Sequence, residues 1–238
     1  KEKVRMKELH LKAAKPFCRM RLSLMGMSGP GKSYWSQKLA EHGFKRFCCD
    51  ALIAQKLRSQ LTAADGAPVE MGKWMGFPYE PGYRIREAQY LAFEVEVVRE
   101  ILEYLRNTTE SDEDIVVDTT GSVVYTGDAI LEELHRRTTI IHLSNPPEVQ
   151  ELMFKAYVAH PTPLLWRELF QMAPSETREA ALTRCYAELL SSREKLYRKY
   201  AAMEIGYFTR RGKDFDVEEL LAAVENHCSG QSSSLSAL

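Results

Sequence analysis

The chain has 238 residues, of which 45% are hydrophobic and 27% are charged, and its formal net charge is −1 at pH 7. This composition is ordinary for a soluble globular protein of one α/β domain, and the near-zero charge gives no general electrostatic reason to bind nucleic acid or a membrane. No apolar run approaches the length of a transmembrane helix. The cysteine usage described next leads us to expect a cytoplasmic protein.

The cysteines argue against a disulfide framework and against a zinc site. There are five of them, an odd number, and none forms a C-x-x-C pair. Reduced thiols in a cytosolic protein explain this pattern better. Because the sequence begins at Lys1 and not at a methionine, an upstream targeting peptide stays open as an alternative.

The two ends of the chain differ in composition from the rest. Residues 1–20 are basic and of mixed charge, and we interpret them as a solvated N-terminal extension in preference to an arm that binds nucleic acid. Residues 229–238 are rich in Ser, and we expect a disordered tail there. The folded domain is therefore predicted to span residues 21–228.

A phosphate-binding loop stands near the start of this domain. The apolar residues 22–25 predict a short strand, and residues 34–41 predict a helix. Between them, residues 26–33 read Gly-Met-Ser-Gly-Pro-Gly-Lys-Ser. This segment fits the pattern G-x-x-x-x-G-K-[ST] in the strand–loop–helix context that gives the pattern its meaning. The alternative is a glycine-rich turn that binds nothing.

The residue types of the loop suit the phosphates of ATP. The glycines let backbone N–H groups point inward at a helix N-terminus, although Pro30 has no N–H to offer. Lys32 is expected to reach the outer phosphates and to act in catalysis, and the Ser33 hydroxyl is expected to bind Mg²⁺. The predicted ATP-binding residues are Gly26, Met27, Ser28, Gly29, Pro30, Gly31, Lys32, Ser33 and Tyr34.

Asp50 follows a second predicted strand. Residues 44–49 predict this strand, and residues 51–58 carry apolar side chains at helical spacing. One interpretation makes Asp50 the N-cap of that helix. The other makes it a carboxylate at the carboxyl end of a strand, where ligands bind in open α/β sheets.

Residues 63–82 are rich in Gly and Pro and carry Trp74, Phe77 and Tyr79. We predict a loop or a small helical insertion whose aromatic side chains pack over the core, with the lining of a substrate pocket as the alternative. A long helix is predicted over residues 83–106.

A third predicted strand, residues 115–118, ends in Asp118. An apolar strand that ends in Asp is the usual form of the second Mg²⁺ element in proteins with this phosphate-binding loop. An Asp that starts a turn is the alternative. We take Asp118 as the candidate for the second metal contact. Residues 119–122 then form a turn of small residues.

The C-terminal half continues the alternation of strands and helices. Residues 139–143 predict a fourth strand, in which we interpret His142 as a packed side chain and not as a metal ligand. Residues 160–176 contain three prolines and the Trp166-Arg167 pair, and they predict a mobile lid. The remaining predicted elements are helices at 129–137, 148–158, 177–201 and 217–226 and a fifth strand at 204–208.

Strands that alternate with helices imply a parallel sheet with right-handed crossovers. We therefore predict an α/β fold of three layers, with a mostly parallel five-stranded sheet and a helical lid.

Several segments carry motifs that occur together in one known family. Residues 26–38 with 50–53 are close to its loop helix and its D-x-D-x-[IL]-I segment, and residues 82–87 are close to its Phe-Arg-x-x-Glu element. Further matches are 139–143 with Pro147-Glu148, Pro163-Leu164-Leu165, and Arg193-Glu194-Lys195-Leu196-Tyr197 with Ala201 and Ile205. In these motifs, over roughly residues 21–208, the chain resembles the shikimate kinase family of small-molecule P-loop kinases.

The resemblance implies a P-loop kinase fold with ATP and Mg²⁺ as cofactors. It also implies that Arg84 and Arg193 hold a carboxylate of the substrate, for which a guanidinium fork is suited. Gly121 falls in the substrate loop of the family. Asp50 would bind the acceptor and would either accept the proton of its hydroxyl group or orient that hydroxyl. The expected acceptor is therefore a hydroxyl of an anionic metabolite.

The sequence departs from the family at several of its functional positions. Cys48 stands where the first carboxylate of D-x-D helps to hold Mg²⁺, and Thr120 and Ser122 flank Gly121 where the family has three glycines. Thr162 stands at the position of the lid arginine, and Met153 lies near the place of the adenine-stacking arginine. Arg167 is a candidate to replace the lid arginine, and a surface salt bridge is the alternative.

Three functions remain at this stage. We expect a shikimate kinase-like phosphotransferase with an alcohol group as acceptor, acting as a monomer on a small molecule and with no nucleic-acid or membrane partner. The second candidate is a P-loop kinase for another acceptor, such as a nucleoside monophosphate or a sugar acid. The third is a catalytically degenerate nucleotide-binding regulatory protein, because a fold does not determine a function.

Overall fold

The structure is a computed structural model that describes residues 20–27, 29, 31–108 and 113–235. The predicted extension at 1–20 therefore lies outside the described residues except for Met20, and so do Ser28 and Pro30. The strands are β1 (Arg21–Met25), β2 (Lys45–Cys48), β3 (Ile115–Asp118), β4 (Thr139–Leu143) and β5 (Met203–Ile205). The helices are α2 (Lys32–Glu41), α3 (Cys49–Lys56), α4 (Met71–Met75), α5 (Tyr83–Asn107), α6 (Asp128–Arg137), α7 (Pro147–Ala159), α8 (Arg178–Tyr200), α9 (Tyr207–Arg210) and α10 (Val217–Leu235), with short 3-10 turns η2 (Val123–Tyr125) and η3 (Arg167–Leu169).

The five strands form one parallel sheet in the order β2-β3-β1-β4-β5. The register pairs Asp118 at the end of β3 with Leu24 of β1 and with Cys48 of β2. The carboxyl ends of these strands therefore meet at one edge of the sheet, where ligands bind in open α/β folds. The predicted α/β fold with a parallel five-stranded sheet is confirmed.

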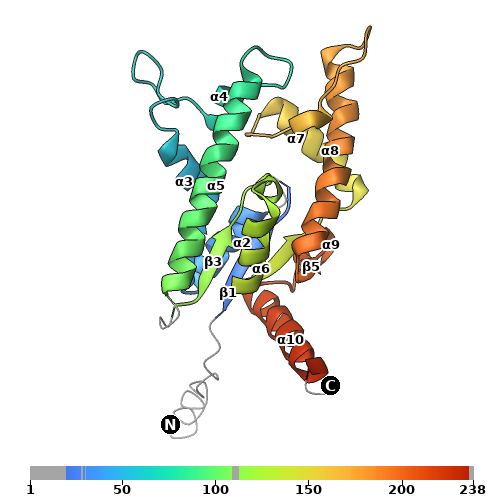
Figure 1. Ribbon diagram of the computed structural model, residues 1–238. Helices are drawn as coiled ribbons and strands as arrows, with labels where there is room; N and C mark the ends of the chain where they lie inside the picture. Colours follow the sequence, from blue (N-terminus) through green and yellow to red (C-terminus); the bar gives the residue numbers. More distant parts are fainter. Residues whose placement is uncertain (1–19, 28, 30, 109–112, 236–238) are drawn as a thin grey trace, which may run out of the picture.

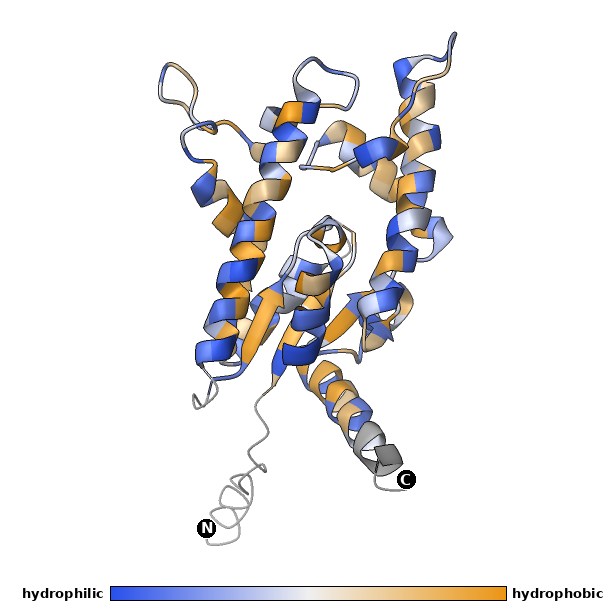
Figure 2. Cartoon of the chain, in the orientation of Figure 1, coloured by the Kyte–Doolittle hydropathy of each residue, from blue (hydrophilic) through white to orange (hydrophobic). Residues whose placement is uncertain are grey.

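Alternate residues of the strands face two separate hydrophobic cores, which makes the fold three layers thick. Ile115 and Val117 of β3 face a core that α5, α6 and α8 complete, while Val116 faces the core beneath α2 and α10. Strands buried on both faces have near-continuous apolar sequences. Figure 2 shows the strands of the sheet as hydrophobic and the helices around them as having hydrophilic outer residues. Figure 1 shows α4 and α7 at the end of the molecule opposite α10.

Two expectations about the C-terminal region were wrong. The fifth strand ends at Ile205, and the chain turns into α9, because the buried Arg210 guanidinium donates to the carbonyl oxygens of Ser144 and Ile205. Helix α10 continues to Leu235, past the predicted end of this helix at residue 226. Extending a helix that is already packed through its first turns costs little, even through Ser residues.

The predicted lid between α7 and α8 contains η3 and is docked on α5. Leu165 and Trp166 are fully buried. The Trp166 backbone N–H donates to Tyr83 Oη at 3.0 Å, and the Arg167 N–H donates to Glu87 Oε1 at 2.7 Å. Buried apolar anchors of this kind hold the segment closed over the sheet edge in this structure.

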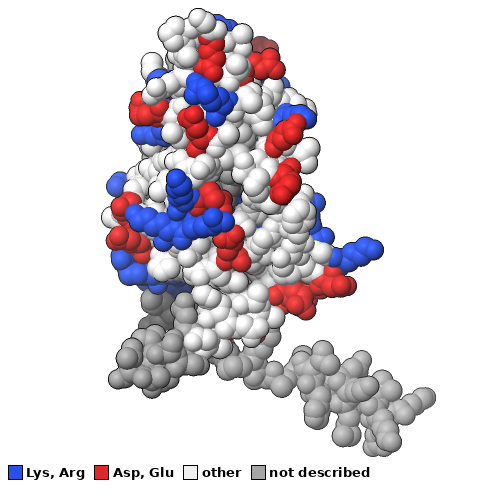
Figure 3. Space-filling view, turned by 90° about the vertical axis from the view of Figure 1, so that its right-hand side faces the viewer, with Lys and Arg blue, Asp and Glu red and all other residues white. Residues whose placement is uncertain are grey.

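Charged side chains of both signs are interspersed on the face shown in Figure 3. In the part of the chain that the structure describes, no helix combines the length and the apolar character needed to span a bilayer.

The close contact between α4 and the lid predicts that a larger residue at Gly72 destabilises the protein. A Cβ atom at Gly72 would lie 1.7 Å from the backbone oxygen of Pro161, so this helix and the start of the lid touch backbone to backbone. We expect Gly72→Ala to lower the free energy of unfolding by about 1–3 kcal/mol, as overpacking does in well-packed interiors.

Urea unfolding would measure this loss. Gly206→Ala is the control, because Gly206 has a φ of −68° and a Cβ there would have Thr209 Oγ1 as its nearest neighbour, at 3.8 Å. Equal stability of the two variants would contradict the proposed close contact.

Candidate active site

The phosphate-binding loop joins β1 to α2 through glycines in conformations that other residues rarely adopt. Gly26, Gly29 and Gly31 have φ angles of 147°, 95° and 104°. A Cβ on Gly26 would lie 2.8 Å from the backbone oxygen of Leu143 at the end of β4. Gly31 is the N-cap of α2. Both left-handed φ values and close backbone approach require glycine here.

Lys32, the first residue of α2, buries its ammonium group under this loop. The Nζ atom donates to the carbonyl oxygens of Gly26 and Met27, both at 2.8 Å, and the side chain is only 6% exposed. Burial lowers the pKa of Lys32, and the nearby carboxylates of Asp50 and Asp118 oppose that shift. The loop thus presents one partly desolvated cation to any phosphate that enters.

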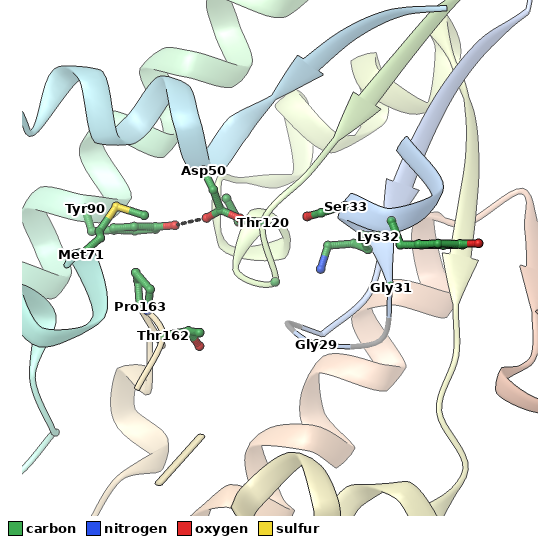
Figure 4. A pocket seen from close by; sticks show the side chains of 12 residues that line it. Gly29, Gly31, Lys32, Ser33, Asp50, Met71, Tyr90, Thr120, Thr162 and Pro163 are labelled. Carbon is green, nitrogen blue, oxygen red and sulfur yellow. Dashed lines mark hydrogen bonds between the residues drawn. The ribbon is translucent and has the colours of Figure 1, made fainter. Parts of the chain in front are cut away.

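A cavity of about 320 Å³ opens beside the loop. Its walls come from the loop with α2, from the helices α3, α4 and α5, from the turn after β3, and from the lid (Figure 4). The lining residues are Gly29, Gly31, Lys32, Ser33, Tyr34, Asp50, Met71, Tyr90, Thr120, Gly121, Thr162 and Pro163.

Asp50 lies in the first turn of α3, whose N-cap is Cys48, so the N-cap interpretation of Asp50 is wrong. Its carboxylate lines the cavity and accepts a hydrogen bond from Tyr90 Oη at 3.1 Å (Figure 4). Desolvation by the surrounding protein raises the pKa of Asp50, while the charge of Lys32 and the hydrogen bond from Tyr90 lower it. Asp50 is therefore a carboxylate positioned across the cavity from Lys32, and its pKa lies above the ordinary value for Asp.

A second carboxylate, Glu94, lies behind the cavity wall. It is fully buried, and both of its oxygens accept hydrogen bonds from hydroxyl groups, Oε1 from Thr120 and Oε2 from Ser122 at 2.8 Å. Burial raises the pKa of Glu94 to about 7, although both hydrogen bonds act in the opposite direction. Thr120 and Ser122 thus serve as donors to a buried carboxylate, at the positions where the family that the sequence resembles has glycines.

Asp118 is buried at the end of β3, and its Oδ2 atom is already engaged. It accepts from Arg46 Nη2 at 2.7 Å and from Ser36 Oγ at 2.9 Å. Asp118 is near enough to Lys32 to affect its pKa, but it is not among the residues that line the cavity. Of the two predicted metal residues, the structure places only Ser33 at the cavity surface.

Arg193 is buried among carbonyl groups and does not line the cavity. Its Nη1 donates to Gly121 O at 2.9 Å and its Nη2 to Leu165 O at 2.7 Å, and Tyr197 Oη also donates to Gly121 O. Arg193 therefore ties the turn after β3 to the lid. The family resemblance implied that Arg193 contacts the acceptor, but the structure places Arg193 outside the lining of the cavity.

Arg84 lies at the start of α5, with its side chain 52% exposed, and is likewise absent from the cavity wall. Its Nη1 donates to Arg167 O at 2.6 Å and lies 3.6 Å from Glu87 Oε2. The Arg167 guanidinium lies 4.0 Å from the same Glu87 oxygen. Both arginines therefore face the buried carboxylate that anchors the lid.

A second, more apolar cavity of about 400 Å³ lies on the other side of the loop. It shares Gly29 and Thr162 with the first cavity. Met153 is in its wall together with other side chains of α7, and Tyr207 and Arg211 close it from the region after β5. The loop and the lid thus stand between a polar and an apolar cavity.

His142 is packed, as predicted, but its neighbours differ from the expectation. It is 1% exposed, with Nε2 3.4 Å from Glu194 Oε2 and Nδ1 3.8 Å from Glu204 Oε2. This cluster could not be predicted, because His142 lies far in the sequence from Glu194 and Glu204. Arg198 pairs with both carboxylates at 3.1 Å, so the group forms an ion-pair network away from the first cavity.

Two residues of the site were not anticipated, Tyr90 in the cavity wall and the buried Glu94 behind it. They lie on the buried face of α5, which runs Tyr83, Glu87, Tyr90, Glu94, Val97. In the sequence, this spacing places carboxylates and phenols within the apolar stripe of the predicted helix. A carboxylate in such a stripe must be hydrogen-bonded or neutral, which is the signal that could have identified it.

Solved structures of shikimate kinases have the same fold. Over 91% of this chain and 96% of the other, the shikimate kinase from Acinetobacter baumannii in complex with shikimate matches with a TM-score of 0.56 and 19% identity. The shikimate kinase from Bacteroides thetaiotaomicron matches with 0.55 and 16%, over 87% of this chain and 99% of that one. Dephospho-CoA kinase from Campylobacter jejuni matches with 0.51 and 15%, over 90% and 100%.

No family model matches the sequence, and no curated protein matches it. At 15–19% identity the structural matches establish the P-loop kinase fold, and the substrate must be argued from the residues themselves.

Glu94 should make the stability of the protein depend on pH. Its pKa is about 7 in the folded protein against an ordinary 4.5, so between these pH values the folded state keeps a proton that the unfolded state has released. The free energy of unfolding therefore falls as the pH rises through this window. We expect Glu94→Gln to remove this contribution, which is roughly 3 kcal/mol across the window.

Urea unfolding of the wild type and the variant at several pH values from 5 to 8 would test this. Glu96→Gln is the control on the same helix, because Glu96 is 53% exposed and pairs with Lys56. Parallel pH profiles for wild type and Glu94→Gln would show that Glu94 is not the group responsible.

Proposed function

We propose that the protein is an ATP-dependent small-molecule kinase that transfers the γ-phosphate of Mg·ATP to a hydroxyl group. The observation that carries this proposal is that Lys32 of the phosphate-binding loop and Asp50 line the same cavity from opposite sides (Figure 4). Phosphoryl transfer requires a cation for the phosphates and a group that orients the attacking hydroxyl. Lys32 and Asp50 supply these two groups in a cavity that the docked lid also lines.

The two cavities suit the two parts of ATP. Phosphates would occupy the loop, where left-handed glycines allow backbone N–H groups to turn toward a ligand and Lys32 would exchange its carbonyl contacts for phosphate contacts. The apolar cavity, with Met153 on one side and Tyr207 and Arg211 on another, suits an aromatic base. Because Gly29 lines both cavities, a single nucleotide can reach from one to the other.

The oxygen donors near the loop fit Mg²⁺, which prefers hard oxygen ligands and keeps several waters. Ser33 would hold the ion directly and Asp118 would hold it through water, since Asp118 stands behind the cavity wall. When bound, the ion neutralises charge on the phosphate oxygens. Cys48 offers no hard oxygen, which leaves these two residues as the proposed metal contacts.

Asp50 is the proposed general base. It accepts a proton from, or orients, the acceptor hydroxyl, while Tyr90 holds its carboxylate in place through one oxygen. Thr162 and Pro163 of the docked lid form the remaining wall and would exclude water from the phosphate. Water exclusion favours transfer to the acceptor over hydrolysis of ATP.

Lys32→Met should separate this proposal from a loop that binds nothing. We expect Mg·ATP affinity to fall about 10-fold to 100-fold and phosphoryl transfer to fall at least about 1,000-fold, because the loop loses its buried cation. Fluorescent-nucleotide binding and ADP release would measure the two effects. Lys38→Met is the matched control on the same helix, since Lys38 is exposed and pairs with Glu41. Unchanged ATP binding in Lys32→Met would argue against the site.

Asp50→Asn tests the chemical step separately. We expect turnover to fall about 100-fold to 10,000-fold, as loss of a general base does, while Mg·ATP affinity changes by no more than about twofold because Asp50 lies across the cavity from the loop. Retained turnover would show that Asp50 does not act on the acceptor. ATP binding without transfer to any acceptor, in the wild type as well, would favour the regulatory alternative.

A further inference from the structure

We propose that the phosphate acceptor is a hydroxyl compound that carries no anionic group. This inference rests on the proposed kinase function and concerns the acceptor end of the same cavity. It departs from what the family resemblance implied, because the two arginines expected to hold a carboxylate are elsewhere. The charges that remain around the acceptor end are negative.

The cavity has a single cation to offer. Among the described residues that line it, only Lys32 is positively charged. Its Nζ lies against the carbonyl oxygens of Gly26 and Met27, inside the loop that would receive the phosphates of ATP. A carboxylate or phosphate on the acceptor would therefore have to share its counter-charge with the nucleotide, which carries several negative charges of its own.

Arg193 is buried outside the lining of the cavity and is held by hydrogen bonds within the protein. Two of its donors bind carbonyl oxygens, and Nε donates to Tyr125 Oη at 3.3 Å. The side chain is 1% exposed and fully enclosed between the turn after β3 and the lid. Releasing it would leave the carbonyl oxygen of Leu165 buried and unpaired, a change that proteins rarely tolerate.

Arg84 and Arg167 are balanced by carboxylates away from the cavity. Glu87, which is 2% exposed, lies 3.6 Å from one guanidinium and 4.0 Å from the other. Glu168 adds a further contact to Arg84 at 3.4 Å. The same Glu87 accepts the backbone N–H of Arg167 and so fixes the lid. These arginines therefore contact the carboxylates that hold the lid and lie outside the lining of the cavity.

The acceptor end itself is lined by a carboxylate and by neutral groups. Asp50 faces the cavity together with Met71, Tyr90 and Thr120 (Figure 4). Behind Thr120 lies the buried carboxyl group of Glu94, whose oxygens accept hydrogen bonds from Thr120 and Ser122. An anionic acceptor would be repelled by these groups, whereas hydroxyl groups can donate to Asp50 and exchange hydrogen bonds with Tyr90 and Thr120.

The test uses the full chain and acceptors in matched sets that differ in charge. Shikimate would be compared with its methyl ester, and D-gluconate with D-glucitol and D-glucamine, by ADP release at saturating Mg·ATP. We expect at least one uncharged or cationic member to be phosphorylated, with a kcat/KM at least about tenfold above that of its carboxylate counterpart. Arg84→Gln should change the KM of that acceptor by less than about twofold.

A variant that adds a cation makes the test sharper. Met71 is partly exposed and lines the acceptor end, so Met71→Arg would supply the missing guanidinium, and Met71→Gln is its neutral control. We expect Met71→Arg to shift the preference toward the carboxylate member by about tenfold or more and Met71→Gln to leave the preference unchanged.

Two failures are distinguishable. If only carboxylate members are phosphorylated, and Arg84→Gln raises their KM about tenfold or more, the kinase function stands and this inference is wrong. If the protein binds Mg·ATP but phosphorylates no member of the panel, the proposed kinase function fails and this inference fails with it.

Discussion

The buried ammonium group of Lys32 is the constraint on which the site depends. A desolvated cation must be surrounded by acceptors or opposite charge. Here the carbonyl oxygens of Gly26 and Met27 accept hydrogen bonds from the ammonium group, and Asp50 and Asp118 lie within electrostatic reach. Those carbonyls can face the ammonium only because the loop curls through left-handed glycines. A phosphate that enters the loop meets a charge that is already positioned and little hydrated, which is the condition for strong electrostatic stabilisation.

The parallel sheet brings these groups together. The strands β1, β2 and β3 end at the same edge of the sheet. The loop, Asp50 and Asp118 each lie at or just after the end of one of these strands, so three separate segments meet at the site. Each carboxylate is then held by a partner from another element, Asp50 by Tyr90 and Asp118 by Arg46. The lid is held in the same manner, by Glu87 of α5. The site is thus built from side chains that are fixed before any ligand arrives, which lowers the reorganisation required for reaction.

Arg193 shows how a matching residue can do different work. Its position within the motif on α8 is similar to that in the shikimate kinase family, yet its guanidinium is used to join the Gly121 carbonyl to the Leu165 carbonyl. The change is linked to its surroundings, where Thr120 and Ser122 donate to Glu94. A buried carboxylate and a buried guanidinium in one region constrain each other, so the substitutions around Gly121 affect the acceptor site as a group.

The sequence by itself determined the phosphate-binding loop, the alternation of strands and helices, and the candidacy of Lys32 and Asp50, because these follow from local spacing and from residues adjacent in the chain. Only the tertiary structure decided which charges are free. Arg84 and Arg193 bind partners that lie far from them in sequence, Leu165 and Arg167 among them, and Glu94 meets the hydroxyls of Thr120 and Ser122 across the core. Whether a charged side chain reaches a ligand depends on such distant partners, which no local pattern encodes.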